Sequence, residues 1–404
     1  MTDITPEALT PTDDEWRLIR ENRGREPHDV ALRVRRSDTV RPWYVAEQVD
    51  GWRRLGGKVP SWAACEGLYF PFPVALQQCS SEAVARWRAS LVVGDSLLDL
   101  TGGLGVDCYF MGRGLRRVTY VDADERAVRA ARHNYGVLGA DNVEFVCSRA
   151  EDYLEAMGGK VGTIFIDPSR RTEGGGRVFR IGDCQPDVGA IGGRMMEMAD
   201  NVVVKLSPLL DVQMVARELR GVRDVYAVGA GGECKDLIVR MCAEWTGEPL
   251  LHAVHVDGDG RGEDFAFRMS EESGVEVRIC DDIGKWLYEP SAEMMKMGAY
   301  GLVCARYGVE AVGRGTHIYT GDEEVTGFPG RRLRVVGVWD FSKRGLGEVR
   351  RVVSGGASVA VRNFPLSAEA LRGRLKVGES SRVFVYGVRC WDGADRLVVG
   401  ERVM

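Results

Sequence analysis

The chain has 404 residues, of which 45% are hydrophobic, and a formal net charge of −5. This length allows about two to four domains, and this composition is typical of a protein that buries real cores. No stretch approaches the about 20 apolar residues that span a bilayer, and the acidic start MTDITPEALTPTDDEW lacks the features of a secretory signal. The ten cysteines are scattered along the chain and none have CxxC spacing, so we expect reduced cysteines and neither a disulfide framework nor a zinc site. We therefore expect a cytoplasmic protein with no membrane association.

Residues 1–90 are predicted to form a helical N-terminal region. The segments DEWRLIRENR and SSEAVARWRASLVV place apolar residues three and four positions apart, which is the helical period. Ser80 and Ser81 stand directly before Glu82, which is a typical helix start with an acid in the first turn.

Residues 91–247 alternate short apolar runs with helical stretches such as ERAVRAARHNYGVL and VQMVARELR. This alternation predicts an α/β domain with a mostly parallel sheet and helices on both faces. The expected strands are 96–100, 117–122, 143–147, 163–167, 201–206, 222–229 and 237–242.

The first of these strands runs into a glycine-rich loop, Leu97-Leu98-Asp99-Leu100-Thr101-Gly102-Gly103-Leu104-Gly105-Val106-Asp107. Glycines let the backbone turn sharply and let a ligand approach the main chain closely. Ligands of open α/β sheets usually bind beyond the carboxyl ends of the parallel strands, where this loop is expected. An ordinary strand-to-helix turn is the alternative interpretation.

The second strand ends in Asp122, about 17 residues after Gly105, where a carboxylate can accept hydrogen bonds from both hydroxyls of a ribose. This combination indicates a cofactor that contains adenosine. A dinucleotide site requires G-x-G-x-x-G to seat a pyrophosphate, and the G-G-x-G of this loop does not match. S-adenosylmethionine (SAM) has no phosphate. Its ammonium group needs an acidic or carbonyl acceptor, and Asp99 is such an acid, so the loop favours SAM over a dinucleotide.

The fourth strand ends in Asp167, followed by Pro168, Ser169, Arg170 and Arg171, at the sheet edge where the glycine loop is expected. Asp167 is placed to accept a hydrogen bond or a proton from an exocyclic amine, and the two arginines match a phosphate. In the alternative interpretation Asp167 caps the turn and the arginines are ordinary surface residues.

The fifth strand carries Lys205 among apolar residues. A lysine in such a strand must bring its ammonium group to water or to an anion. We predict that Lys205 lines the same pocket and contacts substrate; a structural lysine that reaches the solvent is the alternative.

The rest of the chain, divided here into 248–325 and 326–404, has a strand-and-turn pattern. His252 and His255 form an HxxH pair, but in the strand-like LLHAVHV this spacing places them on opposite faces, so no metal site is expected. From Arg331 to Met404 there are 15 Lys and Arg against 7 Asp and Glu, a net charge of +8, while the remainder carries −13. A basic terminal domain suggests a polyanion as partner, although a solvated charged surface remains open.

DLTGGLGVD and VTYVDADERAV resemble motifs I and II of the class I SAM-dependent methyltransferases. The resemblance implies a Rossmann-like core with a seven-stranded, mostly parallel sheet. It also implies that the glycine loop passes the methionine part of SAM and that the acid after strand two holds the ribose. The segment NVEFVCSRAEDY resembles the next motif, in which an acid lies near the adenine amino group. Arg149 stands at that position here, so the backbone near Ala150, or Glu151, would contact the adenine instead. The implied cofactor contacts are Asp99, Thr101, Gly102, Gly103, Gly105, Asp122, Ala123 and Ala150.

The segment after strand four resembles the [DN]-P-P-[aromatic] motif of amino-methylating relatives. Asp167 and Pro168 match it, whereas Ser169 and Arg170 replace the second proline and the aromatic residue. The resemblance implies that Asp167 and the Pro168 region hold the target amine. Arg170, Arg171 and Lys205 are the predicted substrate contacts.

The wider chain resembles a bacterial family of class I methyltransferases with a ferredoxin-like segment and small α+β domains ending in a C-terminal THUMP-like domain. The resemblance is carried by QCSSEAVARW, IDPSRR, VVKLSPLLD, GECKDLIV, YEPSAEMMKMGAY and VRNFPLSAEALRGRLKV. It implies a SAM-binding core at 91–247, a ferredoxin-like segment at 248–325 and a basic THUMP-like domain at 326–404. THUMP domains bind RNA in tRNA-modifying enzymes, which agrees with the +8 charge.

The segment CSSEAVA is also similar to the T-P-E-x-x-A segment of trimethylguanosine synthase, which places Ser81 and Glu82 near the SAM pocket. The sequence therefore predicts methyl transfer to an RNA base in tRNA or rRNA, at an amino nitrogen such as guanine N2. A methyltransferase for a small molecule or protein, and a catalytically idle SAM- or RNA-binding module, remain as alternatives.

Overall fold

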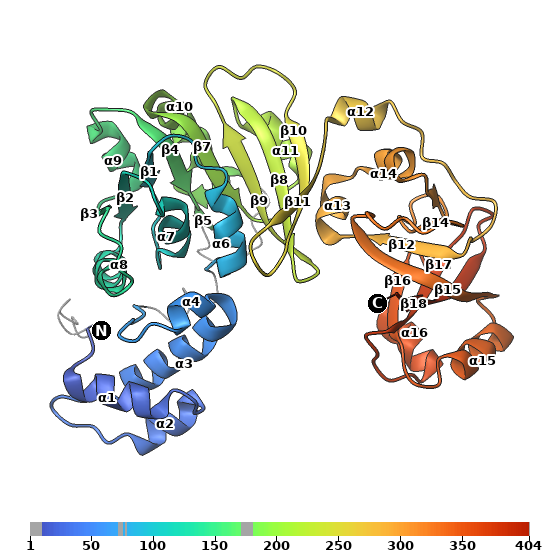
Figure 1. Ribbon diagram of the computed structural model, residues 1–404, viewed down its shortest axis with the longest axis horizontal. Coiled ribbons are helices and arrows are strands. Elements are labelled where there is room, and N and C mark those ends of the chain that lie inside the picture. The colour runs from blue at the N-terminus through green and yellow to red at the C-terminus, as the bar shows by residue number, and fades with distance from the viewer. Residues whose placement is uncertain (1–9, 72–75, 77–78, 171–180, 404) are drawn as a thin grey trace. The chain divides into compact units, whose positions relative to one another are not determined.

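The structure of the protein is a computed structural model that describes residues 10–71, 76, 79–170 and 181–403 (Figure 1). The chain forms two compact units. Unit 1 comprises residues 1–230, 236–249 and 256–263, and unit 2 comprises residues 231–235, 250–255 and 264–404.

Unit 1 begins with the expected helical region. Thr12 starts the first helix with a capping box, in which its hydroxyl accepts from the Glu15 amide at 3.2 Å and Glu15 accepts from the Thr12 amide at 3.0 Å. The helices pack on the rest of the unit through Trp62, whose ring meets Tyr109 edge-on with centroids 5.5 Å apart. The region contains α1 (Asp13–Asn22), α2 (Pro27–Arg33), α3 (Pro42–Lys58), α4 (Pro60–Ala63) and α6 (Glu82–Ala89).

The sheet of unit 1 confirms the predicted α/β class. Within the described part of the unit, seven strands follow the order β8-β9-β7-β4-β1-β2-β3. The pairs β1–β2, β1–β4, β2–β3 and β4–β7 are parallel, and β9 runs antiparallel to β7. The strands are β1 (Ser96–Asp99), β2 (Arg117–Asp122), β3 (Val143–Cys147), β4 (Val161–Ile166), β7 (Ala199–Leu206), β8 (Val222–Ala230) and β9 (Glu233–Met241).

Helices alternate with these strands along the chain, as the hydrophobic pattern predicts. The central strands β4 and β7 are almost continuously buried, because helices pack against the sheet. This arrangement brings the carboxyl ends of β1, β2, β4 and β7 to one edge, where the loops that follow them meet. The helices are α7 (Val106–Gly112), α8 (Glu125–Val137), α9 (Ala150–Ala156), α10 (Val188–Met198) and α11 (Val212–Glu218).

Short elements follow β4. The two-residue strands β5 (Ser169–Arg170) and β6 (Cys184–Gln185) pair antiparallel, and the 3-10 helix η2 (Ile181–Asp183) precedes β6.

Further along, β10 (Leu250–Val256) and β11 (Gly262–Phe267) are each divided between the two units. His252 and His255 lie in β10 as expected and bond to different partners, Asp264 at 2.7 Å and Glu293 at 3.1 Å.

Unit 2 contains a second sheet, whose described strands follow the order β13-β14-β12-β15-β18-β17-β16. The strands are β12 (Trp286–Pro290), β13 (Glu310–Ala311), β14 (Tyr319–Gly321), β15 (Gly330–Asp340), β16 (Ser358–Arg362), β17 (Val383–Arg389) and β18 (Asp395–Arg402). The helices are α12 (Met269–Ser273), α13 (Ala292–Met297), α14 (Tyr300–Tyr307), α15 (Lys343–Val352) and α16 (Ala368–Leu375).

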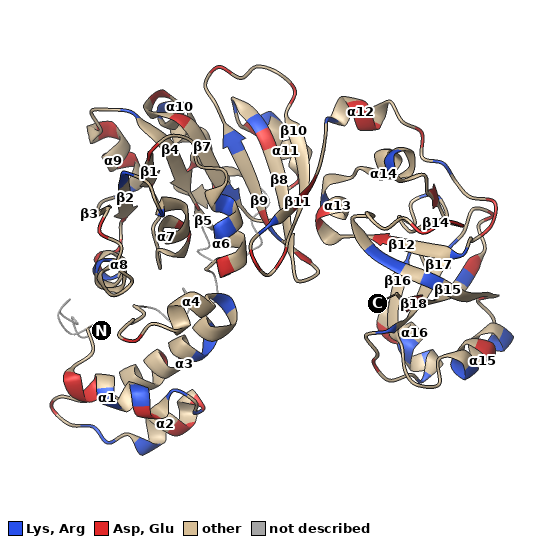
Figure 2. Ribbon diagram, viewed as in Figure 1, with Lys and Arg blue, Asp and Glu red and all other residues tan. Residues whose placement is uncertain are grey.

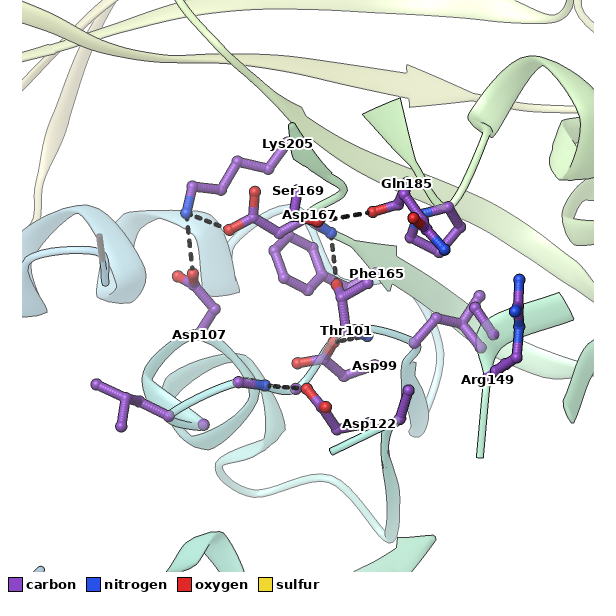
Figure 3. A pocket seen from close by; sticks show the side chains of 18 of the residues that line it. Asp99, Thr101, Asp107, Asp122, Arg149, Phe165, Asp167, Ser169, Gln185 and Lys205 are labelled. Atoms are coloured by element: carbon purple, nitrogen blue, oxygen red, sulfur yellow. Dashed lines mark hydrogen bonds and ion pairs between the residues drawn. The ribbon is translucent and has the colours of Figure 1, made fainter. Parts of the chain in front are cut away.

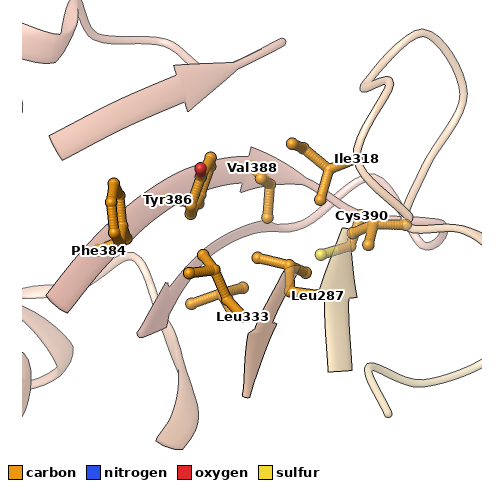
Figure 4. Close-up of a cluster of buried hydrophobic side chains, with 9 residues drawn as sticks. Leu287, Ile318, Leu333, Phe384, Tyr386, Val388 and Cys390 are labelled. Carbon is orange, nitrogen blue, oxygen red and sulfur yellow. The ribbon is translucent and has the colours of Figure 1, made fainter. Parts of the chain in front are cut away.

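Two hydrophobic clusters hold unit 2 together. One packs Leu287, Leu333, Phe384 and Tyr386 against the segment that contains Ile318 (Figure 4). The other packs α15 and α16 onto the sheet and contains Val349, Val353, Leu371, Leu375, Val385 and Val399. Because both clusters draw residues from several strands, the sheet is a stable platform for the loops and side chains around it.

Candidate functional site

The loops at the carboxyl edge of the unit 1 sheet surround a pocket of about 590 Å³ (Figure 3). This volume falls within the usual range for small-molecule sites. Ten of the residues predicted from the sequence line it together: Asp99, Thr101, Gly102, Gly103, Gly105, Asp122, Ala123, Ala150, Asp167 and Lys205. Pro168 is buried and is not among the lining residues.

The glycine loop lines the pocket with its backbone and packs closely against neighbouring tyrosine rings. Gly103 and Gly105 have φ angles of +55° and +81°, in the left-handed region that favours glycine. A Cβ atom at Gly102 would collide with the ring of Tyr120, and one at Gly105 would lie 2.8 Å from the ring of Tyr135. Glycine is therefore required at three positions of this loop, by the close tyrosine ring at Gly102, by the positive φ at Gly103 and by both at Gly105.

Two tyrosines from neighbouring elements hold the loop in place. The Tyr120 hydroxyl donates to the Gly103 carbonyl at 2.6 Å, and the Tyr135 hydroxyl donates to the Gly105 carbonyl at 2.6 Å. Both rings are fully buried, so the loop rests on a rigid base. The sequence analysis missed both tyrosines, although Tyr120 stands two residues before Asp122 on a predicted strand.

Asp99 ends β1 beneath the loop, where it accepts a hydrogen bond from the Thr101 amide at 3.0 Å. It is almost completely buried, and burial raises its pKa well above the ordinary value, with the nearby charges of Asp107, Asp122 and Asp167 adding to the effect. A cation in the pocket would favour the ionised form of this carboxyl. Asp99 thus suits the ammonium group of an amino-acid tail.

Asp122 ends β2 on the other side of the loop. One carboxylate oxygen accepts from the Gly103 amide at 2.8 Å and the other accepts from the Asp124 amide at 2.8 Å. These bonds fix the orientation of the carboxylate and leave lone pairs on both oxygens. Partial burial raises its pKa despite the two bonds. A carboxylate held in this way can bind a pair of vicinal hydroxyls.

Asp167 follows β4 and is joined directly to the glycine loop and to Lys205. Its amide donates to the Thr101 hydroxyl at 2.6 Å, and its Oδ2 lies 2.6 Å from the Lys205 ammonium nitrogen. Its side chain remains 38% exposed, toward the pocket. Burial of the group raises its pKa, while Lys205 opposes that shift. Among the described residues, Oδ1 of Asp167 has no hydrogen-bond partner.

Lys205 belongs to a chain of buried charges behind the pocket. Its ammonium also lies 3.6 Å from Asp107 Oδ2, and Asp107 in turn pairs with Arg88 and accepts from the Ser80 hydroxyl at 2.8 Å. Arg88 is completely buried and reaches Asp236 at 2.7 Å with its second nitrogen. Burial lowers the pKa of Lys205, but the neighbouring acids outweigh it, so the net shift is upward and the lysine stays a cation.

Arg88, Asp107 and Asp236 are functional neighbours that the sequence analysis missed. Asp107 was the last residue of the glycine motif but received no role, and Arg88 and Asp236 are 148 positions apart. Their contacts depend on α6, α7 and β9 coming together. The sequence offered one signal, the aspartate Asp107 in the otherwise apolar segment VDCYFMG, since a buried charge requires a partner.

The resemblance places Ser81 and Glu82 near the pocket, and neither residue is among those that line it. The Ser81 hydroxyl caps α6 by accepting from the Val84 amide, and Glu82 accepts from the Ser61 amide at 2.8 Å and pairs with Arg86. These bonds direct both side chains to the start of the helix. The residue from this segment that lines the pocket is Cys79.

The adenine side of the predicted site contains Arg149, Ala150 and Glu151, all of which line the pocket. Arg149 precedes α9 and lies 3.6 Å from Glu151. Ser169, Gln185 and Pro186 also line the pocket. They belong to the paired strands β5 and β6 and the residue that follows them, which the sequence analysis did not anticipate.

The side chains of the two predicted phosphate-binding arginines, Arg170 and Arg171, lie outside what the structure describes. For Arg170 the structure describes only the backbone, in β5, and Arg171 lies outside the described residues. In the described ranges, no group of three or more His, Cys, Asp or Glu side chains is arranged to hold a metal ion. None of the described helices has the length and apolar character to cross a membrane.

Comparison with known proteins identifies the C-terminal domains. Residues 286–329 match the profile of a ferredoxin-like domain, and residues 330–402 match that of a THUMP domain-like family. Among curated proteins, none has a sequence that matches this chain. Two partial likenesses, each with a TM-score of 0.30 over 39% of this chain, are a candidate methyltransferase from Streptococcus mutans in complex with S-adenosylhomocysteine and an rRNA methylase from Streptococcus thermophilus. Their sequences are 12% and 13% identical to this chain, and the alignments cover 93% and 94% of their own lengths.

A solved structure resembles this chain over nearly its whole length. It is a candidate methyltransferase from Porphyromonas gingivalis W83, with a TM-score of 0.86 and 29% identity, and the alignment covers 98% of this chain and 100% of that one. Such a likeness extends over the glycine-loop core and both C-terminal domains together. By this fold and domain composition, the chain resembles SAM-dependent methyltransferases and carries a ferredoxin-like and a THUMP-like domain.

Proposed function

We propose that the protein transfers a methyl group from SAM to an exocyclic amino nitrogen of an RNA base in tRNA or rRNA, with guanine N2 as the favoured acceptor. The observation that carries the proposal is the position of Asp167. It lies in the wall of the glycine-loop pocket, held by Thr101 and Lys205, with one carboxylate oxygen left for a substrate.

The pocket fits SAM on its own chemistry. The backbone of Gly102, Gly103 and Gly105 lines the pocket, and loop residues without side chains suit the close approach of a methionine tail. Asp99 would balance the ammonium group, and Asp122 would accept hydrogen bonds from the ribose hydroxyls. Thr101, Ala123 and Ala150 would complete the contacts to the cofactor.

SAM supplies an already activated methyl group, so the protein mainly has to align the acceptor and manage one proton. In the proposed mechanism, Asp167 accepts a hydrogen bond from the amino group through Oδ1 and takes up the proton that the nitrogen loses. Lys205 keeps Asp167 oriented and ionised. Because its own pKa is raised, Lys205 acts as a fixed cation and not as the base.

RNA as the substrate is supported by the charge of the C-terminal domain. Lys and Arg residues are frequent along β15, α15 and α16 (Figure 2). We define the α15–α16 basic surface as the exposed residues Lys343, Arg344, Arg350, Arg374 and Lys376. The two helices are joined where Arg350 donates to the Arg374 carbonyl at 3.1 Å. Such a concentration of cations suits a phosphate backbone.

The proposal is tested by methyl transfer from tritiated SAM to total bacterial RNA. The intact protein should label the RNA, and Asp167→Ala should remove most of the label, since one general base typically contributes about 100-fold or more. The Asp95→Ala variant, at an exposed aspartate in the loop before β1, is the matched control and should retain activity.

Three results would change the conclusion. Labelling that survives Asp167→Ala unchanged would remove the role of that residue. Label that enters protein or small molecules but no RNA would favour the alternative substrate classes. SAM binding without any transfer would favour an idle cofactor-binding module.

A further inference from the structure

Lys205 of β7 lies between two carboxylates and not one. Its ammonium nitrogen is 2.6 Å from Asp167 Oδ2 and 3.6 Å from Asp107 Oδ2 (Figure 3). Behind Asp107, which belongs to α7, Arg88 of α6 pairs with it through one nitrogen and with Asp236 of β9 at 2.7 Å through another. We call these five residues the Lys205 charge network.

The charges of this network do not cancel until one carboxylate takes up a proton. Three carboxylates face two cations, which gives a net charge of −1 when every group is ionised. Arg88 is completely buried, and the side chains of Lys205 and Asp107 are only 9% and 11% exposed. Since buried charges need partners, the network is best balanced when Asp167 carries a proton and two acids face two cations.

Asp107 is held as an anion in one orientation. Its Oδ2 accepts from the Ser80 hydroxyl at 2.8 Å, while its Oδ1 faces Arg88. Burial raises the pKa of Asp107, but the charges of Arg88 and Lys205 and the bond from Ser80 outweigh burial, so the net shift is downward. Asp107 therefore stays ionised while Asp167 gains and loses a proton.

Lys205 needs a second partner because the proposed reaction removes the charge of its first one. When the acceptor nitrogen loses its proton, an N–H bond breaks and an O–H bond forms on Oδ1 of Asp167, which becomes neutral. Without Asp107, the buried ammonium group of Lys205 would then have no carboxylate beside it, at a large cost in free energy. With Asp107 in place, the ammonium group keeps one anion in both protonation states.

We propose that Asp107 is a positioning residue, the permanent counterion of Lys205, and that it allows Asp167 to take up the proton of the acceptor amine. Arg88 and Asp236 hold Asp107 in place from α6 and β9. Asp107 acts on the reaction through Lys205. This role rests on the proposed function, because it requires Asp167 to be the base.

Other titratable and charged groups interact electrostatically with the two carboxyls and with Lys205. Burial raises the pKa of Asp99 and of the Cys79 and Cys108 thiols, which favours the neutral form of each. The remaining groups are Asp122 of β2 and Lys58 of α3. All five are present in each variant described below, so a difference between variants reports on the substituted residue.

The first test is the pH dependence of kcat/KM for methyl transfer to RNA by the full chain. Asp107→Asn should move the midpoint of the acidic limb down by about one pH unit, because loss of a nearby negative charge lowers the pKa of Asp167. The rate on the plateau should fall about threefold, since a weaker base accepts the proton less readily. Asp95→Asn, at an aspartate that is 62% exposed, is the matched control and should change neither quantity.

Asp236→Asn is a second variant that tests the same network if Asp107→Asn does not fold. It also removes one negative charge, so the midpoint should move in the same direction, but less, because Arg88 lies between Asp236 and Asp107.

The second test needs no methyl transfer. Nuclear magnetic resonance of protein labelled with carbon-13 at the aspartate carboxyls follows each titration directly, and the signal absent from Asp167→Asn belongs to Asp167. Its midpoint should fall by about one pH unit in Asp107→Asn and should not change in Asp95→Asn.

The outcomes distinguish the role of Asp107 from the proposed function. If the Asp167 signal titrates at the same pH in Asp107→Asn and Asp236→Asn as in the intact protein, or at a higher pH, as loss of the Lys205 cation would cause, Asp107 is not the counterion. Methylation of RNA that requires Asp167 would still support the proposed function in that case. If the midpoint of Asp167 falls as described but no RNA is methylated, the role of Asp107 stands and the proposed function fails.

Discussion

Asp167 and Lys205 form the ion pair on which the proposed chemistry of the pocket depends. Two effects oppose each other at Asp167, since burial raises its pKa and Lys205 lowers it. Behind them, Asp107 and Arg88 hold the lysine within the wall of the pocket. The position of Lys205 therefore sets the pH range in which Asp167 can act.

Lys205→Gln should move the acidic limb of the methyl-transfer rate to higher pH. The rate depends on ionised Asp167, and loss of the lysine charge leaves burial unopposed, which raises the pKa of that carboxyl. The measurement is the pH dependence of kcat/KM for RNA methylation. Lys235→Gln, at a half-exposed lysine in β9, is the control. An unchanged midpoint would show that Asp167 does not limit the rate by its ionisation.

Asp99→Asn should stabilise the protein and weaken SAM binding. The pKa of Asp99 is raised in the folded state, so ionisation opposes folding, and the stability present at low pH is lost as pH rises from the unfolded toward the folded pKa. A neutral amide removes this loss, which is worth about 1.4 kcal/mol for each unit of pKa shift. Unfolding in urea at pH 4 and pH 7 measures the gain, and calorimetry measures SAM affinity. Equal stability of both proteins at pH 7 would contradict the account.

At the scale of the elements, the glycine loop works as a rigid turn between β1 and α7. Gly105→Ala combines left-handed strain with a collision against Tyr135, so unfolding should become easier by about 2 to 4 kcal/mol. Gly114→Ala is the matched control, because its φ is +77° but a Cβ there meets nothing within 4 Å. It should lose only about 1 kcal/mol and keep its affinity for SAM. Equal losses for the two variants would show that Tyr135 does not restrict the loop.

The elements that could be predicted from the sequence are those with a strong local pattern. All seven strands expected between 91 and 247 are present within a few residues of their predicted bounds, and α6 begins after Ser81 as its cap residue indicates. The glycine loop and Asp122 were identifiable because their spacing along two consecutive strands places them at one sheet edge.

The contacts that could not be predicted are long-range. Arg88 reaches Asp236 across 148 positions, and nothing local to either residue specifies the other. The β5–β6 rim depends on two-residue strands, too short to produce a periodic pattern. The bond from the Ser61 amide to Glu82 spans 21 positions and is likewise specified by nothing local to either residue.

For the whole molecule, the separation of charge between the C-terminal region and the remainder is the main reason to expect an RNA substrate. Removal of residues 331–404 would be a poor test, because β15 pairs with β12 and its loss would open the sheet of unit 2. Substitutions on the α15–α16 basic surface leave the sheet intact and are therefore the better choice.

The triple variant Lys343→Gln, Arg344→Gln, Arg374→Gln should reduce the salt slope of RNA binding by about two, because each lost phosphate contact removes about 0.7 to 0.9. The charge-matched control is Arg126→Gln, Arg129→Gln, Arg132→Gln on the exposed face of α8. Titration of total RNA between about 50 and about 200 mM salt compares the two variants. Equal slopes for both triple variants would remove the special role of the terminal domain.

The most direct test of the central claim is mass spectrometry of nucleosides from RNA incubated with the protein and SAM that carries a trideuterated methyl group. We predict a deuterated methyl group on an exocyclic amino nitrogen of one base, formed by the intact protein and lost with Asp167→Ala. Deuterated methyl groups found only in protein or small molecules, or on no molecule while SAM still binds, would contradict the account.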